Sequence, residues 1–578
     1  MNYVKFTIII LAILSIMLLP TAIALNNDEL VVIVPKTIDS LNPFISRTRL
    51  GWAIATLVTD TILKPSNSFY YYYSVKPWIV VKWAHRNNYT TWILRLNNKL
   101  SWSDGTPVNS RDLMFTLCYL RDQNIPPWSL LLRSLTSIKI INETSAMINF
   151  STPAPYLLRL LVAIPLINEK EVEGLNLARI RYFNITLGPY HVVEYTDDRI
   201  VLAFNNRYSI GEIPYKRIVF LLSNDSEKAY DLLMSNKVDV VIDLISPFRI
   251  KDFINNQAYR LVISPGLSLF MMVLNNKNPY LRDIAFRYAL RLCLNMTKIR
   301  VEVFNNYVDI TRTYIPLHFF PPKGIPDYID VLKDYGIDIN YNLTSAQELL
   351  KSLGYADYNN DGIFEDFNRN EIVLTLVSIK GDPVLENVAK VLANEIRNLG
   401  VKMHEEFLEA NEFINRVYVL RDFDIALIEV PYFIFPSPEF IALMAISEEY
   451  REGGISLVFS NSDFLSLKTL HEYNLTAKLE ETLDLEGILY AESNYIPLFN
   501  RPIIEISYKE KVPEYSMIYG LLAADSLVSI GKIQRGWNIP FSLIKLMINV
   551  AIVIVGLVAL YSAIHIVESG YLMRILRP

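Results

Sequence analysis

Residues 89–112, YTTWILRLNNKLSWSDGTPVNSRD, contain a strand, a tight turn and the start of a helix. Residues 89–96 alternate in the manner of a strand with one buried face. Asp104-Gly105, with a proline two residues later, predicts a turn. Ser110 is a suitable N-cap and an acidic residue follows in the first turn, so we expect a helix to begin there. This local order sets the pattern for the rest of the chain.

Strands alternate with helices on both sides of this stretch. Residues 28–34, DELVVIV, read as a buried strand near the N-terminus. Further along, residues 371–379 predict a strand, residues 383–400 a long amphipathic helix ended by glycine, and residues 423–430 another strand. This alternation favours α/β lobes with mixed sheets.

The two ends of the chain differ from its interior. Residues 1–24 have a lysine, an apolar run and a small-residue Ala-Ile-Ala pattern, as expected of a signal peptide. Residues 546–564 form an uncharged run of 19 residues, long enough to cross a bilayer as one helix. Two arginines in residues 565–578 place that tail in the cytoplasm by the positive-inside rule. We therefore expect a single-pass membrane protein with a linker at 531–545 and its bulk outside the cell.

Composition excludes some functions and is compatible with an exterior location. The 55 basic and 60 acidic side chains give a net charge of −5, which argues against a nucleic-acid scaffold. Only Cys118 and Cys293 are present, and both lie in apolar stretches, so two buried free thiols are expected rather than a disulfide framework. Eight glycosylation sequons are compatible with a glycoprotein; they begin at Asn88, Asn142, Asn149, Asn184, Asn224, Asn295, Asn342 and Asn474.

No enzymatic signature is found in the chain. Phosphate-loop, GxGxxG, HExxH, GxSxG and CxxC motifs are all missing from the sequence. A catalytic triad is defined in space rather than by spacing, so an enzyme stays open at this point.

An acidic loop carries the one constellation suited to a metal. Its candidate oxygen donors, at alternate positions of a tight turn with glycine at the sixth place, suit a structural Ca²⁺. They are Asp357, Asn359, Asp361, the carbonyl of Ile363, and Glu365 or Asp366. An EF-hand is excluded because its twelfth position requires glutamate and Asn368 stands there. A solvated acidic turn is the alternative.

Several motifs together resemble extracytoplasmic solute-binding protein family 5. The most specific is LSWSDGTPV at 100–108, and LGPY at 187–190, LGY at 353–355 and IPL at 496–498 follow in the family's order. The resemblance implies an α/β, two-lobed, periplasmic-binding-protein-like fold of type II with an extra subdomain. Lobe I is then expected at 29–50, 186–268 and 487–530, the extra subdomain at 51–185, and lobe II at 269–486. The hinge is expected near 264–266 and 486–487.

The resemblance also implies where a ligand would lie. In the peptide-binding members, an aspartate that follows the strand corresponding to residues 423–430 pairs with the ligand's ammonium group. Residues 429–438 of this chain contain no aspartate. Glu429 could substitute, or could be a buried glutamate satisfied by backbone amides. Lys380 could meet a ligand carboxylate or be a surface lysine, Tyr432 and Phe433 could stack on the ligand or pack within a lobe, and Asn42 is a further candidate contact.

The resemblance implies a receptor of an ABC importer, without catalysis of its own. It would capture an oligopeptide between its lobes and deliver it to permease subunits and their ATPases, with no nucleic acid as partner. An oligosaccharide receptor on the same fold is one alternative. A surface hydrolase or an envelope structural protein is another.

Overall fold

The computed structural model describes residues 29–46, 48–65, 75–123, 128–173, 175–264, 268–308, 314, 340–430, 493–512, 522, 526–528 and 530. The expected signal peptide at 1–24 and apolar run at 546–564 lie outside these ranges. Among the helices within them, none combines the length and the apolar character needed to cross a bilayer.

A seven-stranded mixed sheet forms lobe I. Its order is β12 (Tyr259–Ser264), β18 (Ile503–Tyr508), β11 (Val240–Ile242), β1 (Glu29–Pro35), β10 (Arg217–Ser223), β9 (Arg199–Phe204) and β8 (Tyr190–Tyr195). β1 runs parallel to both of its neighbours. Its side chains alternate between two cores, Val32 and Val34 facing one and Ile33 the other. Both faces are therefore covered, which explains a continuous apolar run instead of a polar–apolar alternation.

Helices cover the two faces of this sheet. The helices of lobe I are α2 (Arg49–Thr59), α7 (Ser226–Met234), the 3-10 turn η2 (Pro247–Arg249) and α8 (Lys251–Ile254). α2 contributes Ile54 and Leu57 to one core, and α7 contributes Ala229 and Leu233 to the other. The sheet is thus the middle layer of three.

A five-stranded mixed sheet forms lobe II. Its order is β15 (Lys402–Leu408), β14 (Val373–Ile379), β16 (Ile425–Val430), β13 (Leu269–Leu274) and β17 (Tyr495–Asn500). Its helices are α9 (Ile284–Leu292), α10 (Met296–Lys298), the π-helix η3 (Ile299–Val303), α12 (Leu343–Ser352), α13 (Pro383–Leu399), α14 (Ala410–Ile414) and the π-helix η6 (Asn415–Leu420). α13 packs on β14 and β15 and ends at Gly400, whose φ of 104° is left-handed. The predicted strand–helix–strand order of this region is therefore present.

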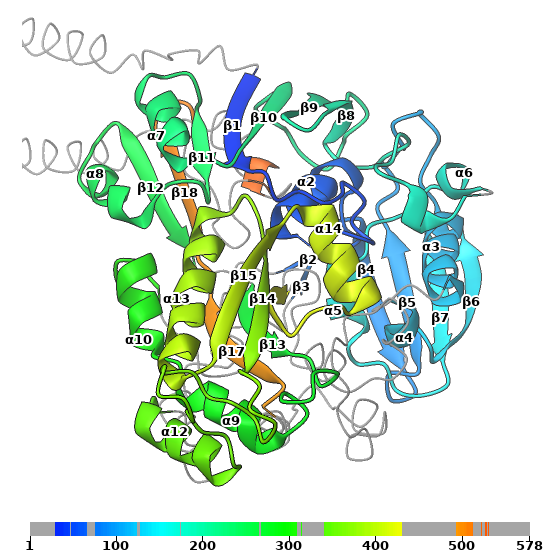
Figure 1. The fold of residues 1–578 in the computed structure, drawn as a ribbon. Coiled ribbons are helices and arrows are strands. Elements are labelled where there is room, and N and C mark those ends of the chain that lie inside the picture. Colours follow the sequence, from blue (N-terminus) through cyan, green and yellow to red (C-terminus); the bar gives the residue numbers. More distant parts are fainter. Residues whose placement is uncertain are drawn as a thin grey trace, which may run out of the picture.

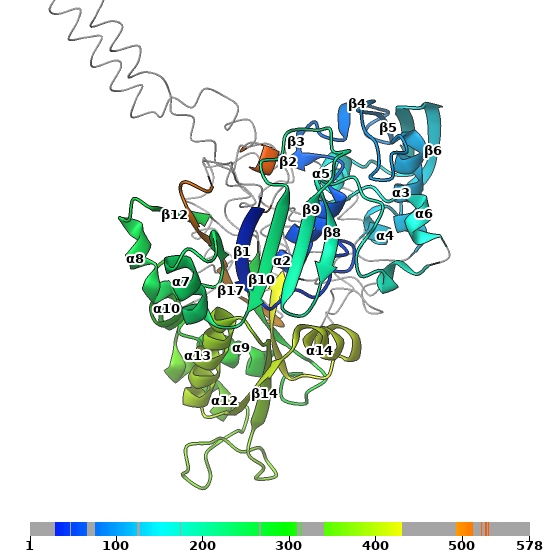
Figure 2. The ribbon, with the colours of Figure 1, turned by 90° about the horizontal axis from the view of Figure 1, so that it is seen from above.

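A four-stranded antiparallel sheet forms the extra subdomain beside lobe I (Figure 2). Its order is β4 (Val80–Arg86), β5 (Thr91–Leu96), β7 (Ser145–Phe150) and β6 (Leu135–Asn142); β2 (Lys64–Pro65) and β3 (Val75–Lys76) form a separate pair. The accompanying helices are α3 (Ser110–Asp122), α4 (Trp128–Leu131), α5 (Leu157–Ala163), α6 (Glu169–Val172) and the 3-10 turn η1 (Leu177–Arg179). β5 alternates as predicted, and α3 packs against β6 and β7.

The turn at Asp104-Gly105 joins the extra subdomain to the segment that returns to lobe I. Asp104 accepts hydrogen bonds from the Thr106 amide and hydroxyl at 2.9 and 2.6 Å. Gly105 has a φ of 89°, which glycine adopts without strain. The Ser103 amide donates to the Thr186 carbonyl at 2.9 Å. The helix that follows begins at Ser110 but is capped by Asn109, not by Ser110 as we predicted.

In the part of the chain that the structure describes, two connections pass between the strands of the two large sheets (Figure 1). The first crossing connects β12 to β13. The second connects β17 to β18 at Arg501 and Pro502, not near 486–487 as we expected, because β17 pairs with β13 inside the lobe II sheet. α2 likewise belongs to the core of lobe I, so the extra subdomain begins after Thr59 instead of at 51. Local sequence could not give either boundary, because the first is set by the pairing of β17 with β13 and the second by the packing of α2 in the core of lobe I.

Gly188 tests the join between α2 and the returning segment. A Cβ at this position would lie 2.4 Å from the Val58 carbonyl oxygen and 2.5 Å from that of Leu57, both backbone atoms. We expect Gly188→Ala to lower the free energy of unfolding, measured by urea titration, by about 1–3 kcal/mol. Gly211→Ala is the comparison, and a smaller loss is expected there, because the three atoms nearest to its added methyl, at 2.5 to 3.2 Å, belong to the Val528 side chain and not to the backbone. Equal losses in the two variants would contradict this packing.

Candidate ligand-binding site between the lobes

A cavity of about 50 Å³ lies between lobe I and lobe II. Its lining comes from both lobes and from the second crossing: Pro35, Thr37, Thr48, Arg49, Leu50 and Asp243; Phe270, Ile379, Asp382, Leu385, Phe413, Ile414, Tyr418, Leu427 and Glu429; and Arg501. Charged, polar and aromatic side chains of both lobes therefore face one space.

Lobe I contributes a buried ion pair at the start of α2. Thr48 caps α2, and its hydroxyl donates to Asp39 at 2.8 Å, which fixes the first turn. Arg49 follows and pairs with Asp243, whose other oxygen accepts the Ile504 amide at 2.9 Å. Burial lowers the pKa of Arg49 to about 10. The pair therefore ties α2 to the end of β11 and to β18.

The second crossing contributes another buried ion pair. Arg501 pairs with Asp382, and the two side chains are 10% and 3% exposed. Asp382 also caps α13, accepting the amides of Val384 and Leu385 at 3.0 and 3.2 Å. The Arg501 guanidinium lies 5.9 Å from the centre of the Phe270 ring. Arg501 therefore joins the crossing strand to the lobe II helix that faces the cavity.

Glu429 provides a third carboxyl group for the two guanidinium groups of the lining. It stands opposite Phe270 in the β13–β16 pairing, so both side chains lie on one face of the sheet. Its Oε1 atom is buried and has no hydrogen-bond partner in the described part of the chain. Burial raises the pKa of this carboxyl, while the Ser268 hydroxyl and the charges of Arg49 and Arg501 oppose the shift. The arrangement leaves an acceptor that a donor on a ligand can satisfy.

The other candidate contacts lie elsewhere. Asn42 is buried, but its side-chain amide donates to the carbonyls of Leu177 and Ile180 at 2.9 Å each, so it holds a loop and does not line the cavity. Lys380 is exposed and pairs with Glu409 at 2.8 Å, also outside the lining. The structure thus places both side chains in other contacts, Lys380 as the surface lysine that was one of its two interpretations. Tyr432 and Phe433 lie outside the described residues.

The charged residues that sequence reasoning missed are Arg49, Asp243, Asp382 and Arg501. Arg49 and Asp243 are 194 positions apart in the sequence, and Asp382 and Arg501 are 119 positions apart, so no local motif could pair them. One local signal was available at Asp382-Pro383, where an N-cap residue precedes proline at the first position of a helix.

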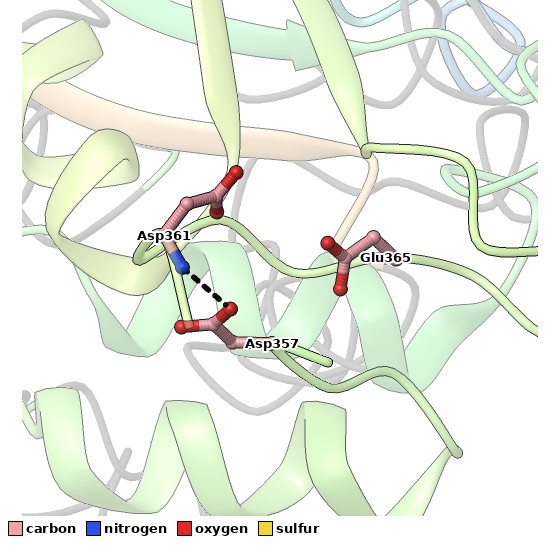
Figure 3. Close-up of side chains that lie close together, drawn as sticks. All are labelled: Asp357, Asp361 and Glu365. Carbon is pink, nitrogen blue, oxygen red and sulfur yellow. Dashed lines mark hydrogen bonds between the residues drawn. The ribbon is translucent and has the colours of Figure 1, made fainter. Parts of the chain in front are cut away.

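The acidic loop lies in lobe II, between α12 and β14, and none of its residues lines the cavity. Figure 3 shows three of its carboxylates close together. Asp357, Asp361 and Glu365 each offer a carboxylate oxygen, all within 4.8 Å of one another. The loop is closed by its own amides, those of Asp361 and Gly362 donating to Asp357 at 3.1 and 2.9 Å. These oxygens fit the hard-donor preference of Ca²⁺, and the same turn is also satisfied without an ion.

Comparison with known proteins gives the family. The profile of the bacterial extracellular solute-binding proteins, family 5 (middle), matches residues 74–450, more than half of the chain. The chain belongs to this family. Oligopeptide-binding protein AppA of Bacillus subtilis is 24% identical over 234 residues, 40% of each chain. Periplasmic oligopeptide-binding protein OppA of Salmonella typhimurium is 23% identical over 268 residues, 42% of this chain and 48% of OppA. These alignments thus span less than half of either relative.

Solved structures show the same fold over a larger share of the chain. The structure of AppA from Bacillus subtilis in complex with a nonapeptide has a TM-score of 0.75 and 16% identity, covering 86% of this chain and 98% of AppA. An oligopeptide-binding protein from Thermotoga maritima with bound mannohexaose has a TM-score of 0.71 and 19% identity, covering 87% and 98%. This chain therefore has the two-lobed periplasmic-binding-protein fold.

Glu429 allows a test by pH. A carboxyl whose folded pKa is raised stabilises the fold below its unfolded pKa, and this contribution is lost as pH rises through the folded pKa. Glu429→Gln is always neutral, so we expect it to melt at a higher temperature than the wild type at pH 8. The difference should shrink toward pH 4.5.

The exposed Glu348→Gln is the control for the charge change and should show no such pH-dependent gain. A Glu429→Gln variant that melts at or below the wild-type temperature at pH 8 would show that the carboxylate is compensated in the fold.

Proposed function

We propose that this protein is the solute receptor of an ABC importer and captures an oligopeptide between its two lobes. The observation that carries the proposal is the interlobe cavity with an unsatisfied carboxyl oxygen on Glu429. The relatives named above are described as oligopeptide-binding, and one solved structure of this fold contains a nonapeptide. Both findings support a peptide ligand.

Recognition follows from the charges of the lining. Arg49 and Arg501 are each neutralised by an aspartate, so a bound anion would compete with an existing partner. Glu429 can instead accept hydrogen bonds from an ammonium group, whose charge favours its ionised form. The rings of Phe270, Phe413 and Tyr418 offer an apolar wall beside it. We therefore propose that the ligand's amino terminus lies at Glu429, with Tyr432 and Phe433 as further contacts.

Transport requires partners and no reaction. The closed form would be read by permease subunits, with ATPases supplying the energy, and we assign no catalytic step to the chain. The apolar stretch at 546–564 would tether the receptor, after removal of residues 1–24, and raise its effective concentration near the permease. A ligand stabilises the closed state of the receptor only by the difference between its affinities for the closed and the open state.

An oligosaccharide ligand is the second candidate. It is favoured by the three aromatic side chains of the lining and by the mannohexaose found in one structure of this fold. Sugar rings pack on aromatic faces and need no cationic group. The two candidates therefore differ in their dependence on Glu429.

Calorimetric titration distinguishes these ligands. Peptides with a free amino terminus, the same peptides N-acetylated, and β- and α-linked oligosaccharides are titrated into the full chain. We expect binding of free peptides, and a loss of about tenfold to a hundredfold on acetylation or in Glu429→Gln, because a charged hydrogen bond is removed. Glu348→Gln should bind as the wild type does. Binding of sugars alone would overturn the peptide proposal.

Calcium in the acidic loop is a separate proposal. If Asp357, Asp361 and Glu365 hold Ca²⁺, adding the ion to chelator-treated protein should raise the melting temperature, since an ion that binds only the folded state stabilises it. Asp361→Asn should remove most of this gain, and Mg²⁺ should give a smaller one. Identical melting in Ca²⁺ and chelator would show that the loop is only a turn.

A further inference from the structure

The sheet of the extra subdomain has one face in the core and one open face. The core face carries Trp92, Leu94 and Leu96 of β5. Side chains two positions apart on a strand share a face, so the pairing register gives the members of the open face. They form three cross-strand rows: Lys82, Arg95 and Ser145; Ala84, Ile93, Met147 and Lys139; and Arg86, Thr91, Asn149 and Ser137.

Four cations stand on this open face, and its strands carry no anion. Lys82, Arg86, Arg95 and Lys139, the basic quartet, are all exposed. The strands β4, β5, β6 and β7 contain no aspartate or glutamate, although the whole chain has a net charge of −5. Within the described ranges, no member of the quartet has an ion-pair partner. The face is therefore a local reversal of the charge of the protein.

The quartet includes a repulsive contact. Lys82 and Arg95 stand directly opposite each other in the β4–β5 pairing, and like charges at such positions destabilise a sheet. Cations on the other sheets pair with carboxylates instead, Arg199 with Glu194 at 2.7 Å being an example. One acidic residue on a neighbouring strand would remove the repulsion. A surface that keeps it is suited to an anionic partner from outside the chain.

The last described residues of the chain lie beside this subdomain. A Cβ built on Gly211 would be 2.5 Å from the side chain of Val528. Two residues before Gly211, the Ser209 hydroxyl donates to the carbonyl of Lys99 at 3.0 Å. Lys99 closely follows β5, which carries Arg95 of the quartet. The chain therefore leaves the described structure next to the subdomain.

The remaining chain is short enough to keep the subdomain near a membrane. Residues 531–545 separate the last described residue from the apolar stretch at 546–564. Even when fully extended, these 15 residues span at most about 54 Å. If the apolar stretch lies in a bilayer, the open face of the subdomain is held within reach of the lipid headgroups.

We propose that the open face of the extra subdomain docks on the anionic lipid surface of the membrane that holds residues 546–564. This rests on the membrane tether of the proposed function. Lipid phosphates would meet the quartet, and the half-buried Ile93 and Met147 in the middle row would face the apolar side of the headgroup layer. The contact orients the subdomain and lobe I on the membrane, while lobe II stays free to move.

A fluorescent label on the open face tests this contact. Ala84→Cys, at an exposed position of the middle row, is labelled with an environment-sensitive dye. Cys118→Ser provides the background, since Cys293 is buried. The full chain is reconstituted in nanodiscs of phosphatidylcholine, with or without phosphatidylglycerol. We expect a blue shift only with phosphatidylglycerol, and its loss in 1 M salt, where the screening length falls to about 3 Å.

Two sets of substitutions separate the quartet from net charge. Replacing its four members by glutamine should abolish the blue shift, and each single replacement should weaken docking about fivefold. The matched control replaces four other exposed lysines by glutamine and should keep the shift; they are Lys228, Lys237, Lys251 and Lys351. The quartet variant should melt at or above the wild-type temperature, because the repulsion between Lys82 and Arg95 is removed. Its loss of signal would then not come from unfolding.

The outcomes separate the docking face from the tether. An equal shift in both kinds of nanodisc, or an equal loss in both quadruple variants, would overturn the docking face. So would binding of soluble polyglutamate to the quartet without any lipid-dependent shift, which would assign the face to an acidic protein. If the chain enters no nanodisc, the tether fails, and flotation with phosphatidylglycerol vesicles decides the face: retention that requires the quartet supports it, and no retention overturns it.

Discussion

The two-lobed arrangement depends on the second connection between the sheets, and the ion pair between Arg501 and Asp382 joins this connection to helix α13 of lobe II. Arg501 lies in the second crossing between the sheets, and its amide donates to the carbonyl of Ser268, next to the first crossing, at 3.1 Å. The strands on either side of the two connections pair with each other, β13 with β17 and β12 with β18. Two adjacent strands are the arrangement about which two lobes can rotate without unfolding.

The charge balance of the cavity follows from this geometry. Removing one partner of a buried pair leaves an uncompensated charge and costs about 3–5 kcal/mol, so Arg501 is bound to Asp382 and Arg49 to Asp243. Neither cation is then free to neutralise Glu429 fully. The fold thus carries a carboxyl whose ionisation burial makes unfavourable. Under the proposed function, a cationic ligand would remove that cost, so stability and recognition would be opposed at this residue.

Sequence reasoning succeeded where the determining signals are local. The alternation in Thr91–Leu96, the amphipathic pattern ended by Gly400 and the strand Ile425–Val430 are short-range features, and they lie where they were predicted. The second crossing was missed because β17 is defined by pairing with β13, more than 200 positions earlier in the sequence. The partners of Asn42 could not be predicted for the same reason, because they are carbonyls of the extra subdomain, far away in the sequence.

The central claim is that two lobes close on a solute about the crossings at 264–268 and 500–503. Small-angle X-ray scattering of the full chain, with and without a saturating oligopeptide, measures this most directly. The account predicts a smaller radius of gyration with the peptide, and a smaller decrease with its N-acetylated form at the lowest concentration at which the free peptide saturates. A radius of gyration that stays constant while calorimetry shows the peptide bound would contradict it, since the cavity would then have to fill without any movement of the lobes.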